Sequence, residues 1–310
     1  MAVVPLRLGE SVPEQVRGSI IAVGNFDGVH LGHAALIAAA RNEAGSTQVA
    51  AVTFDPHPLV LLAPERYQPP LTTMSDRARH LGEIGADHVV VLQTTRQLLA
   101  LAPEAFFERI VCEALQASGM VEGFNFRFGL DRAGSNETLR LLCQAAGMRF
   151  REVSAFEKDG RPVSSSLVRN ALNEGNVLAA AALLNRRYHL TGIVASGAKR
   201  GRTIGFPTAN LGGIEALVPA EGVYAVVANT LSGRFAGAAN IGPNPTFGEQ
   251  TRKIEVHLLD FTGELYGTSM TVEFAERLRG TTKFAGVNEL KDQLEKDVAS
   301  VRRIAVLQGG

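Results

Sequence analysis

The chain has 310 residues, of which 45% are hydrophobic and 20% are charged, a composition typical of a soluble globular protein. It carries 31 basic and 31 acidic residues, so there is no net charge to attract a nucleic acid or an anionic membrane. These values argue against a nucleic-acid-binding protein, and the length allows two domains of ordinary size.

Short β-branched runs alternate with helical patterns over the first half of the chain. Strands are predicted at residues 19–24, 48–54, 88–92 and 120–123, and helices at 31–44, 75–84, 103–115 and 135–146. Ser75, with Asp76 in the first turn, is expected to begin the second of these helices. The alternation predicts an α/β domain with a parallel sheet covered by helices on both faces. Such sheets bind ligands at the carboxyl ends of their strands.

The pattern changes after residue 186. Short segments broken by Gly, Pro and Asn follow, and strands are predicted at 222–229, 234–241, 253–259 and 269–274. They indicate an antiparallel barrel or sandwich. Residues 288–307 are predicted to form a helix whose single apolar stripe packs on the barrel. The change of pattern predicts two domains, 1–186 and 187–310.

Cys112 and Cys143 are the only cysteines, and two cysteines cannot form a disulfide framework or a thiolate zinc site. We therefore expect buried, reduced thiols. The N-terminus lacks the basic start and continuous apolar core of a signal peptide, and no stretch approaches the roughly 18 apolar residues of a membrane span. These features predict a cytoplasmic protein without a membrane partner.

The segment GNFDGVHLGH, residues 24–33, follows the first predicted strand. His30 and His33 lie three positions apart at the start of a helix, so their side chains share one face. A helix N-terminus offers unpaired N–H groups and the positive end of the dipole to an anion. This predicts a site for a triphosphate attacked at its α-phosphorus, with imidazole N–H groups stabilising the phosphoryl oxygens. The phosphate-binding candidates in the loop are Gly24, Asn25, Phe26, Asp27 and Gly28.

Other interpretations of the histidine pair are possible. Two histidines at this spacing also occur on solvated or core-packed faces. A zinc site needs a third ligand, for which Asp27 is the nearest candidate, and no HExxH element is present. A covalent histidine mechanism has no second signature. The glycines and the strand–loop–helix context favour phosphate binding.

The pattern GxFDGxHxGH resembles the signature of bacterial FMN adenylyltransferases, within the wider HxGH nucleotidyltransferase superfamily. Three further segments agree in order and spacing: FDPHP at 54–58, GFNFRFG at 123–129 and VSSSLVR at 163–169. The resemblance implies a Rossmann-like nucleotidyltransferase domain that uses ATP.

The serines of the VSSSLVR segment precede a helical pattern, where hydroxyls and free N–H groups can meet phosphate. The candidates are Ser164, Ser165 and Ser166, the last of which stands where the family usually has Thr. Arg169 is placed to reach the β- and γ-phosphates and stabilise the departing pyrophosphate. An N-cap followed by a surface arginine explains the same residues without a ligand.

The GFNFRFG segment offers one polar and two aromatic candidates. Asn125 can hydrogen-bond a phosphate or the incoming nucleophile, and Phe126 or Phe128 can stack on an isoalloxazine or adenine ring. Core packing explains the two phenylalanines equally well. His57, between two prolines, is a further candidate for the flavin site.

The second half contains GAKRGRTIGFPTANL at 197–211, which is not a Walker A loop because it lacks GxxxxGK[ST]. Thr208 and Asn210 offer oxygen ligands to Mg²⁺. The loop before them supplies the ATP-binding candidates Gly197, Lys199, Arg200 and Gly201. A solvated hairpin explains AKRGR alone, but not the PTAN run that follows.

PTAN, NIGPNPTFG at 240–248 and IEVHLLDF at 254–261 are together similar to riboflavin kinase, a six-stranded barrel. By that resemblance Glu255 is the general base that takes the proton of the ribityl 5′-hydroxyl. On its own, the alternating strand 253–259 places Glu255 on a face that is either solvent or a cleft. Ala198 stands where most members of that family have an acid.

The two motif sets identify the chain as a member of the bifunctional riboflavin kinase/FMN adenylyltransferase family, the prokaryotic FAD synthetases. The resemblance implies phosphorylation of riboflavin to FMN with ADP as by-product, then adenylylation of FMN to FAD and pyrophosphate. Mg²⁺ is the expected cofactor, ATP a co-substrate, no resident cofactor is required, and the protein is expected to be a monomer or weak oligomer. The alternatives are an HxGH nucleotidyltransferase acting on another phosphorylated substrate, and a flavin-binding regulator.

Overall fold

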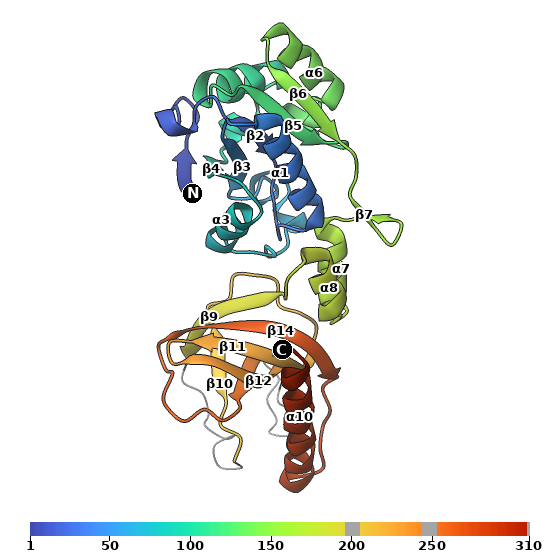
Figure 1. The fold of residues 1–310 in the computed structure, drawn as a ribbon. Helices are drawn as coiled ribbons and strands as arrows, with labels where there is room; N and C mark the ends of the chain where they lie inside the picture. The colour runs from blue at the N-terminus through green and yellow to red at the C-terminus, as the bar shows by residue number, and fades with distance from the viewer. Residues whose placement is uncertain (196–204, 244–252, 309–310) are drawn as a thin grey trace. The chain divides into compact units, whose positions relative to one another are not determined.

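The structure is a computed structural model that describes residues 1–195, 205–243 and 253–308 (Figure 1). The chain forms two compact units, Met1–Ser165 and Ser166–Gly310, each with its own sheet. The predicted boundary after residue 186 falls two helices later, beyond α7 (Ser165–Asn173) and α8 (Val177–Leu184). That boundary stays a prediction.

The first unit is built on a sheet of six parallel strands in the order β1-β4-β3-β2-β5-β6. The strands are β1 (Ala2–Leu6), β2 (Ile20–Val23), β3 (Val49–Asp55), β4 (His88–Gln93), β5 (Gly119–Gly123) and β6 (Arg149–Val153). The predicted parallel sheet is thus confirmed, with two edge strands, β1 and β6, that the sequence analysis did not identify. Because β3 and β5 lie on opposite sides of β2, the strand order reverses between β2 and β5, where open sheets of this type bind ligands.

Helices connect these strands, and several lie within one or two residues of the predicted ranges. The α-helices are α1 (Leu31–Ala44), α2 (Leu59–Leu62), α3 (Met74–Glu83), α4 (Arg96–Leu99), α5 (Pro103–Phe106) and α6 (Asn136–Ala145), with short turns η1 (Glu14–Val16), η2 (Pro64–Arg66) and η4 (Leu130–Arg132). The predicted helix 103–115 is divided into α5 and a π-helix, η3 (Phe107–Ala114). A small hairpin of β7 (Glu157–Lys158) and β8 (Arg161–Pro162) precedes α7.

The start of α3 differs from the prediction. Its N-cap is Thr73, whose hydroxyl accepts the Asp76 N–H at 3.1 Å, so Ser75 lies inside the first turn. The prediction that Ser75 begins the helix was therefore wrong. A hydroxyl three residues before the amide it caps has the preferred geometry, and Ser75 is one residue before Asp76.

Both faces of the first sheet are buried, as expected where helices cover a parallel sheet. Alternate residues of β2 point to opposite sides: Ile21 and Val23 pack with Phe106, Phe107 and Leu139, whereas Ile20 and Ala22 pack with Leu36, Ile37 and Leu81. Cys143 is buried in the first of these layers and Cys112 is half-buried beside it, both as free thiols. Burial, reinforced by nearby acidic groups, raises the pKa of the Cys143 thiol to about 12.

The second unit contains a closed barrel of six antiparallel strands in the order β10-β13-β12-β11-β14-β9. They are β9 (His189–Ala195), β10 (Ala209–Gly212), β11 (Gly222–Thr230), β12 (Gly233–Gly242), β13 (Lys253–Leu258) and β14 (Ser269–Arg279). Tyr224 and Phe274 are fully buried, with their rings edge to face at 5.3 Å between centroids. The barrel confirms the predicted architecture of the second half.

The C-terminal helix α10 (Val287–Gln308) packs on the barrel, as the apolar stripe predicted (Figure 1). Val301 and Ile304 lie against Ala225 and Ala275, whose small side chains let the helix approach closely. Asp297, 3% exposed, accepts charge-assisted hydrogen bonds from both Nε and Nη2 of Arg279 on β14 at 2.8–3.1 Å. A bidentate pair of this kind fixes the orientation of the helix as well as its position.

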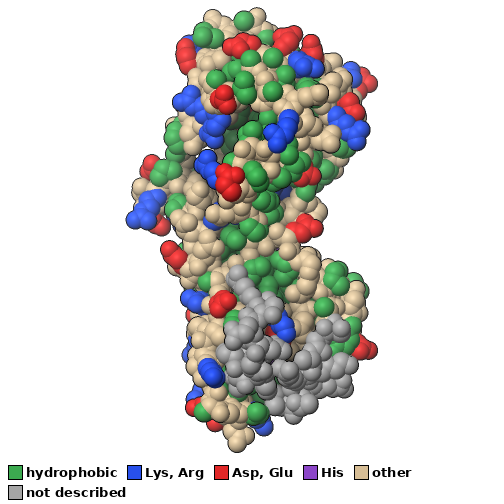
Figure 2. Space-filling model, turned by 180° about the vertical axis from the view of Figure 1, so that it is seen from behind, with side chains coloured by type: hydrophobic (Ala, Val, Ile, Leu, Met, Phe, Trp, Pro, Cys, Tyr) green, Lys and Arg blue, Asp and Glu red, His purple; other side chains and the backbone are tan. Residues whose placement is uncertain are grey.

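Within the described part of the chain, no helix has the length and apolar character needed to cross a membrane. Basic and acidic side chains are interspersed over the described surface that Figure 2 shows, in keeping with their equal numbers.

Candidate functional site

The loop between β2 and α1 begins where the strand order reverses. Its backbone has positive φ at Phe26 (48°), Gly28 (81°) and Val29 (42°), a region that β-branched residues rarely occupy. The side chains of Phe26 and Val29 are 1% and 2% exposed and pack in the apolar layer beneath α1. A backbone with such φ values is stable only where the surrounding packing holds it in place. The buried side chains of Phe26 and Val29 therefore fix the shape of the loop before any ligand binds.

His30 and His33 cap the first turn of α1 reciprocally. His30 is the N-cap residue, and its Nδ1 accepts the His33 N–H at 3.4 Å, while Nδ1 of His33 accepts the His30 N–H at 3.3 Å. The two rings stack with centroids 3.7 Å apart and planes 15° apart. The prediction that they share one face of the first turn is therefore confirmed in geometry, although His30 lies at the cap and not within the helix.

The reciprocal caps determine which ring nitrogen carries a proton. A nitrogen that accepts a backbone N–H cannot itself be protonated, so each Nδ1 is bare and each neutral ring carries its proton on Nε2. Both rings then donate through Nε2. The amides of Leu31 and Gly32 belong to the first turn, whose N–H groups have no partner within the helix. The helix start thus offers imidazole and amide donors to an anion.

Asp27 is turned into the protein and away from solvent. Its Oδ1 accepts the N–H groups of Leu71 at 2.8 Å and Thr72 at 3.4 Å, and Nη2 of Arg77 lies 3.4 Å away. The side chains of Asp27 and Arg77 are 7% and 6% exposed. Asp27 therefore anchors the loop to the start of α3. The sequence suggested Asp27 only as a phosphate-binding candidate and did not predict these structural contacts.

Two threonines hold the rest of the loop. The Gly28 N–H donates to Thr72 Oγ1 at 3.3 Å. Arg77 Nη1 donates to Thr53 Oγ1 at 3.3 Å, and that hydroxyl donates to the Asn25 carbonyl at 3.1 Å. Sequence analysis missed Arg77, Thr53 and Thr72, because nothing in their own segments distinguishes them until the topology brings them together.

The VSSSLVR segment reaches the same loop. Ser165 Oγ donates to the Asp27 carbonyl at 2.8 Å. A Cβ at Gly32 would come within 3.1 Å of the His30 ring and 3.3 Å of the Val163 carbonyl, so only glycine fits there without displacing its neighbours. Gly32 is a further residue that sequence analysis did not select, although it is the glycine of the HxGH pattern itself.

The remaining residues of that segment lie around the start of α7. Ser164 is half-buried, Ser166 is exposed and Arg169 is half-buried. Ser166 and Arg169 belong to the second compact unit. Their assigned contacts with phosphate stay predictions.

The GFNFRFG loop follows β5 directly. Asn125 is exposed and Phe126 is half-buried. Phe128 is 6% exposed and packs against Phe126 and Phe106, with ring centroids 5.6 and 5.9 Å away. Phe124 is the exposed ring of the loop, at 49%, and sequence analysis did not select it. The stacking of flavin or adenine on Phe126 or Phe128 stays a prediction.

His57 lies just beyond β3. Its Nδ1 accepts the Leu59 N–H at 3.1 Å, and its ring stands 5.8 Å from the half-exposed ring of Tyr67. An imidazole and a phenol thus sit together beyond the carboxyl end of the strand. A role for His57 in a flavin site stays a prediction.

In the barrel, three polar residues form a row across neighbouring strands. Asn210 of β10 pairs with Glu255 of β13, which pairs in turn with Asn240 of β12. All three are half-buried, whereas Ile254 and Val256 on either side of Glu255 point into the barrel. Directly opposite residues place their side chains on the same face. The structure therefore brings Asn210 and Glu255 together, and adds Asn240, which sequence analysis had not selected as a site residue.

The PTAN segment is fastened to the same face by His257. The Pro207 carbonyl lies 2.8 Å from Nδ1 of His257, and because a carbonyl only accepts, the ring donates through Nδ1. Phe206 packs edge to face on this ring at 5.4 Å between centroids. His257 lies two residues from Glu255 on one face of β13, and Asn210 pairs with Glu255, so the PTAN segment is held along this face. Four further candidates lie outside the described residues: Gly197, Lys199, Arg200 and Gly201.

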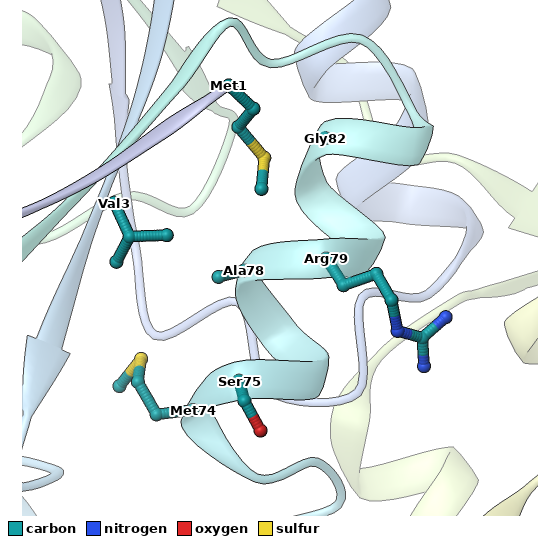
Figure 3. A pocket seen from close by; sticks show the side chains of 7 residues that line it. All are labelled: Met1, Val3, Met74, Ser75, Ala78, Arg79 and Gly82. Atoms are coloured by element: carbon teal, nitrogen blue, oxygen red, sulfur yellow. The ribbon is translucent and has the colours of Figure 1, made fainter.

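An apolar cavity between β1 and α3 is separate from these sites (Figure 3). Its lining comprises Met1, Val3, Met74, Ser75, Ala78, Arg79 and Gly82. Arg79 is paired with Asp76 at 2.9 Å and with Glu83 at 2.8 Å. The cavity shares no lining residue with the β2–α1 loop or with the row on the barrel.

Among the described residues, no third histidine, cysteine or carboxylate forms a metal-binding group with His30 and His33. The donors of the β2–α1 loop are N–H groups, which recognise anions. The barrel row presents amide and carboxylate oxygens, with the Thr208 hydroxyl on the adjoining segment, and such oxygens are ligands that Mg²⁺ prefers.

Comparisons with known proteins agree with both sets of motifs. Residues 12–167 match the family of FAD synthetases, and residues 184–305 match the family of riboflavin kinases. The crystal structure titled "Macrolide-efflux Protein from Streptococcus pneumoniae" covers 97% of this chain and 98% of its own, with a TM-score of 0.87 and 31% identity. Its title names another activity for that protein.

Curated relatives match almost end to end. The bifunctional riboflavin kinase/FMN adenylyltransferases of Escherichia coli (strain K12) and Bacillus subtilis (strain 168) are 36% and 37% identical, each match covering 92% of both chains. The Listeria monocytogenes enzyme is 40% identical over 91% of both chains. The predicted pair of activities is thus confirmed by relatives over nearly the whole length, and this chain belongs to the bifunctional riboflavin kinase/FMN adenylyltransferase family.

Proposed function

We propose that two functional domains, residues 1–186 and 187–310, divide the two reactions between them. The barrel phosphorylates riboflavin with ATP to give FMN and ADP. The parallel-sheet domain then joins FMN to the adenylyl group of a second ATP, giving FAD and pyrophosphate. The positions of the two family matches along the chain support this division.

The observation that carries the adenylyltransferase assignment is the reciprocally capped pair His30 and His33 at the start of α1. An oxygen of the FMN phosphate attacks the α-phosphorus of ATP, and the bond from that phosphorus to the β-phosphate oxygen breaks. Negative charge grows on the non-bridging oxygens of the α-phosphate. The Nε2–H groups of both rings and the first-turn amides are donors fixed in advance for this charge, which is how a preorganised site lowers a barrier.

The other residues of this domain bind and orient the substrates. Ser164, Ser165 and Ser166 contact the triphosphate, and Arg169 stabilises the departing pyrophosphate. Asn125 orients the FMN phosphate. His57, Phe126 and Phe128, on the segments that follow β3 and β5, are the candidates that contact the isoalloxazine ring. Proximity of the two bound substrates then provides much of the rate enhancement.

In the barrel, Glu255 is the general base. It takes the proton from the ribityl 5′-hydroxyl as that oxygen attacks the γ-phosphorus of ATP, and the bond from the γ-phosphorus to ADP breaks. Thr208 and Asn210 would hold Mg²⁺, which neutralises charge on the phosphates when bound. Both residues are half-buried, and Asn210 pairs directly with Glu255, which supports this assignment. The loop residues Gly197, Lys199, Arg200 and Gly201 bind the ATP phosphates.

Flavin is substrate and product of this protein, so no resident cofactor is required. We place the protein in the cytoplasm, as a monomer or weak oligomer, and the two free thiols support the first of these assignments.

A time course with riboflavin, ATP and MgCl₂ tests this function. Chromatography should show FMN first and FAD after it. A chain that makes FMN but converts none of it to FAD would be an HxGH nucleotidyltransferase for another phosphorylated substrate. A chain that binds flavin and makes neither product would be a flavin-binding regulator.

A further inference from the structure

A buried glutamate lies where the strand order of the first sheet reverses. Glu122 is the fourth residue of β5 and is 1% exposed. The backbone ladder between β2 and β5 covers only the pairs Ile20–Gly119 and Ile21–Met120. Beyond that point the two strands no longer pair, and Glu122 lies in the stretch where they separate.

Where the backbone ladder between β2 and β5 ends, the Glu122 side chain joins the two strands by a hydrogen bond. The Val23 N–H donates to Glu122 Oε1 at 2.8 Å. Successive amides of a strand point to opposite sides, and the next one, Gly24 N–H, donates to Val52 on β3 at 3.0 Å. The Val23 amide therefore points toward β5, and the carboxyl takes the place that a β5 carbonyl would occupy in a continued ladder.

The surroundings of this carboxyl are apolar. Met120 points to the same face of β5, and it lies in one apolar layer with Val23, Phe128 and Cys143. Burial raises the pKa of the Glu122 carboxyl well above its usual range, and the Val23 N–H opposes this only in part. Burying a carboxyl among apolar side chains costs free energy, and the hydrogen bond from the Val23 N–H offsets part of that cost. An apolar residue at position 122 could not accept this hydrogen bond.

The two strands linked by Glu122 lead into the two loops that carry the candidate substrate contacts. Gly24, one residue after Val23, begins the loop between β2 and α1, which we call the phosphate loop. Phe124, two residues after Glu122, lies in the GFNFRFG loop, which we call the aromatic loop. Each loop is anchored outward, Gly24 to β3 and Phe124 to the Val153 carbonyl of β6 at 2.9 Å. The bond from Val23 to Glu122 is a direct link between the two strands at this point.

We propose that Glu122 is a positioning residue for adenylyl transfer, which sets the separation between the phosphate loop and the aromatic loop by linking β2 to β5 where their ladder ends. This inference rests on the proposed function, in which FMN and ATP meet at this edge of the sheet. Small errors in the placement of two reacting groups lower the rate strongly. Loss of the link should therefore lower kcat for FAD formation more than it raises KM.

Glu122→Leu and Glu122→Gln test the link. Leucine fills the apolar site without an acceptor, whereas glutamine retains an Oε1 that can accept the Val23 N–H. Glu152→Leu is the matched control, because Glu152 is the partner of Glu122 in the register of β6 but is exposed. FAD formation from FMN and ATP is measured in each full-length protein, with riboflavin phosphorylation by the same sample as the internal standard.

We expect kcat for FAD formation to fall about tenfold or more in the leucine variant, with riboflavin phosphorylation unchanged. The glutamine and control variants should stay within about twofold of wild type. Full adenylylation in a folded leucine variant would overturn the proposal. A folded glutamine variant that has lost adenylylation would also overturn it, even if the leucine variant does not fold. Wild-type protein that makes no FAD would instead contradict the proposed function.

Discussion

The two candidate sites are built in opposite ways. In the first unit the β2–α1 loop is held by buried residues, among them Asp27, His30 and Arg77. In the barrel, Asn210, Glu255 and Asn240 are half-buried and project from strands that pair through their backbone ladders. The residues that build the first site also stabilise it, whereas the second site is added to a scaffold that is already complete.

This difference predicts how each site responds to substitution. Changes in the first site should cost stability and activity together. Changes on the barrel row should cost activity alone.

Glu255→Gln should give the largest effect. Removing the general base should slow riboflavin phosphorylation by about 10²–10⁴-fold, because the 5′-hydroxyl then keeps its proton as it attacks. The melting temperature and FAD formation from supplied FMN should be unchanged. Steady-state kinetics and thermal melts check this. A large loss of stability would show that the barrel needs Glu255 and would break the contrast.

His33→Ala should abolish most FAD formation, by about 10²–10³-fold, because a preorganised donor to the phosphoryl oxygens is lost. It should also cost about 1 kcal/mol of stability, since the Nδ1 that caps the His30 N–H is removed. Initial rates of FAD formation and urea unfolding measure the two effects. Riboflavin phosphorylation by the same protein is the control, and its loss would contradict separate sites.

Asp27→Ala should act mainly through stability. It leaves Arg77 without its buried carboxylate, a change that typically costs about 3–5 kcal/mol, and it releases the Leu71 and Thr72 amides. FAD formation should fall with the loss of the loop. Urea unfolding gives the stability change, and Glu108→Ala, at an exposed acid of the same unit, is the matched control. An Asp27 variant as stable as wild type would show that the loop does not depend on this anchor.

The fourth prediction concerns the pH dependence of stability. Because the pKa of Glu122 is raised on folding, the stability from its neutral form is complete below the unfolded pKa of about 4.3 and is lost as pH rises through the folded pKa. The Glu122→Gln variant has no titratable group at this position. Its stability relative to wild type should therefore increase between pH 5 and pH 8, by at most about 1.4 kcal/mol per pH unit.

Unfolding of both proteins across that pH range measures the difference. The other titratable groups near Glu122 are the Cys143 thiol, with Cys112 beyond it, and the Glu152 carboxyl on β6, and they are the same in both proteins. A difference in stability that does not change with pH would mean that Glu122 ionises as it does in water.

Local pattern predicted much of the fold. The range of α1 follows from its Ala/Leu-rich run, and its observed bounds, Leu31–Ala44, agree with the prediction. The central strands β2 to β5 were found because their buried, β-branched runs are strong signals. The edge strand β6 was missed because its sequence RFREV is largely polar and mostly exposed, so it lacks both the apolar run and the alternation of a strand.

The candidate site was predicted only as far as its motifs extend. The pairing of His30 with His33 follows from their spacing, but the reciprocal caps depend on ring orientation. Arg77, Thr53 and Glu122 hold the site through hydrogen bonds to residues 24–99 positions away in sequence. Such partners are chosen by topology, and no local pattern marks them.

A mixing assay tests the central claim, that each reaction is complete within its own half of one chain. Glu255→Gln and His33→Ala proteins are each given riboflavin and ATP with MgCl₂, alone and then together, and FAD is followed in time. Each variant alone should make little or no FAD, because one lacks the base for the first step and the other a donor for the second. Mixed, they should make FAD, with FMN from one protein used by the other. A mixture that makes no FAD, although each variant keeps its remaining activity, would contradict the claim.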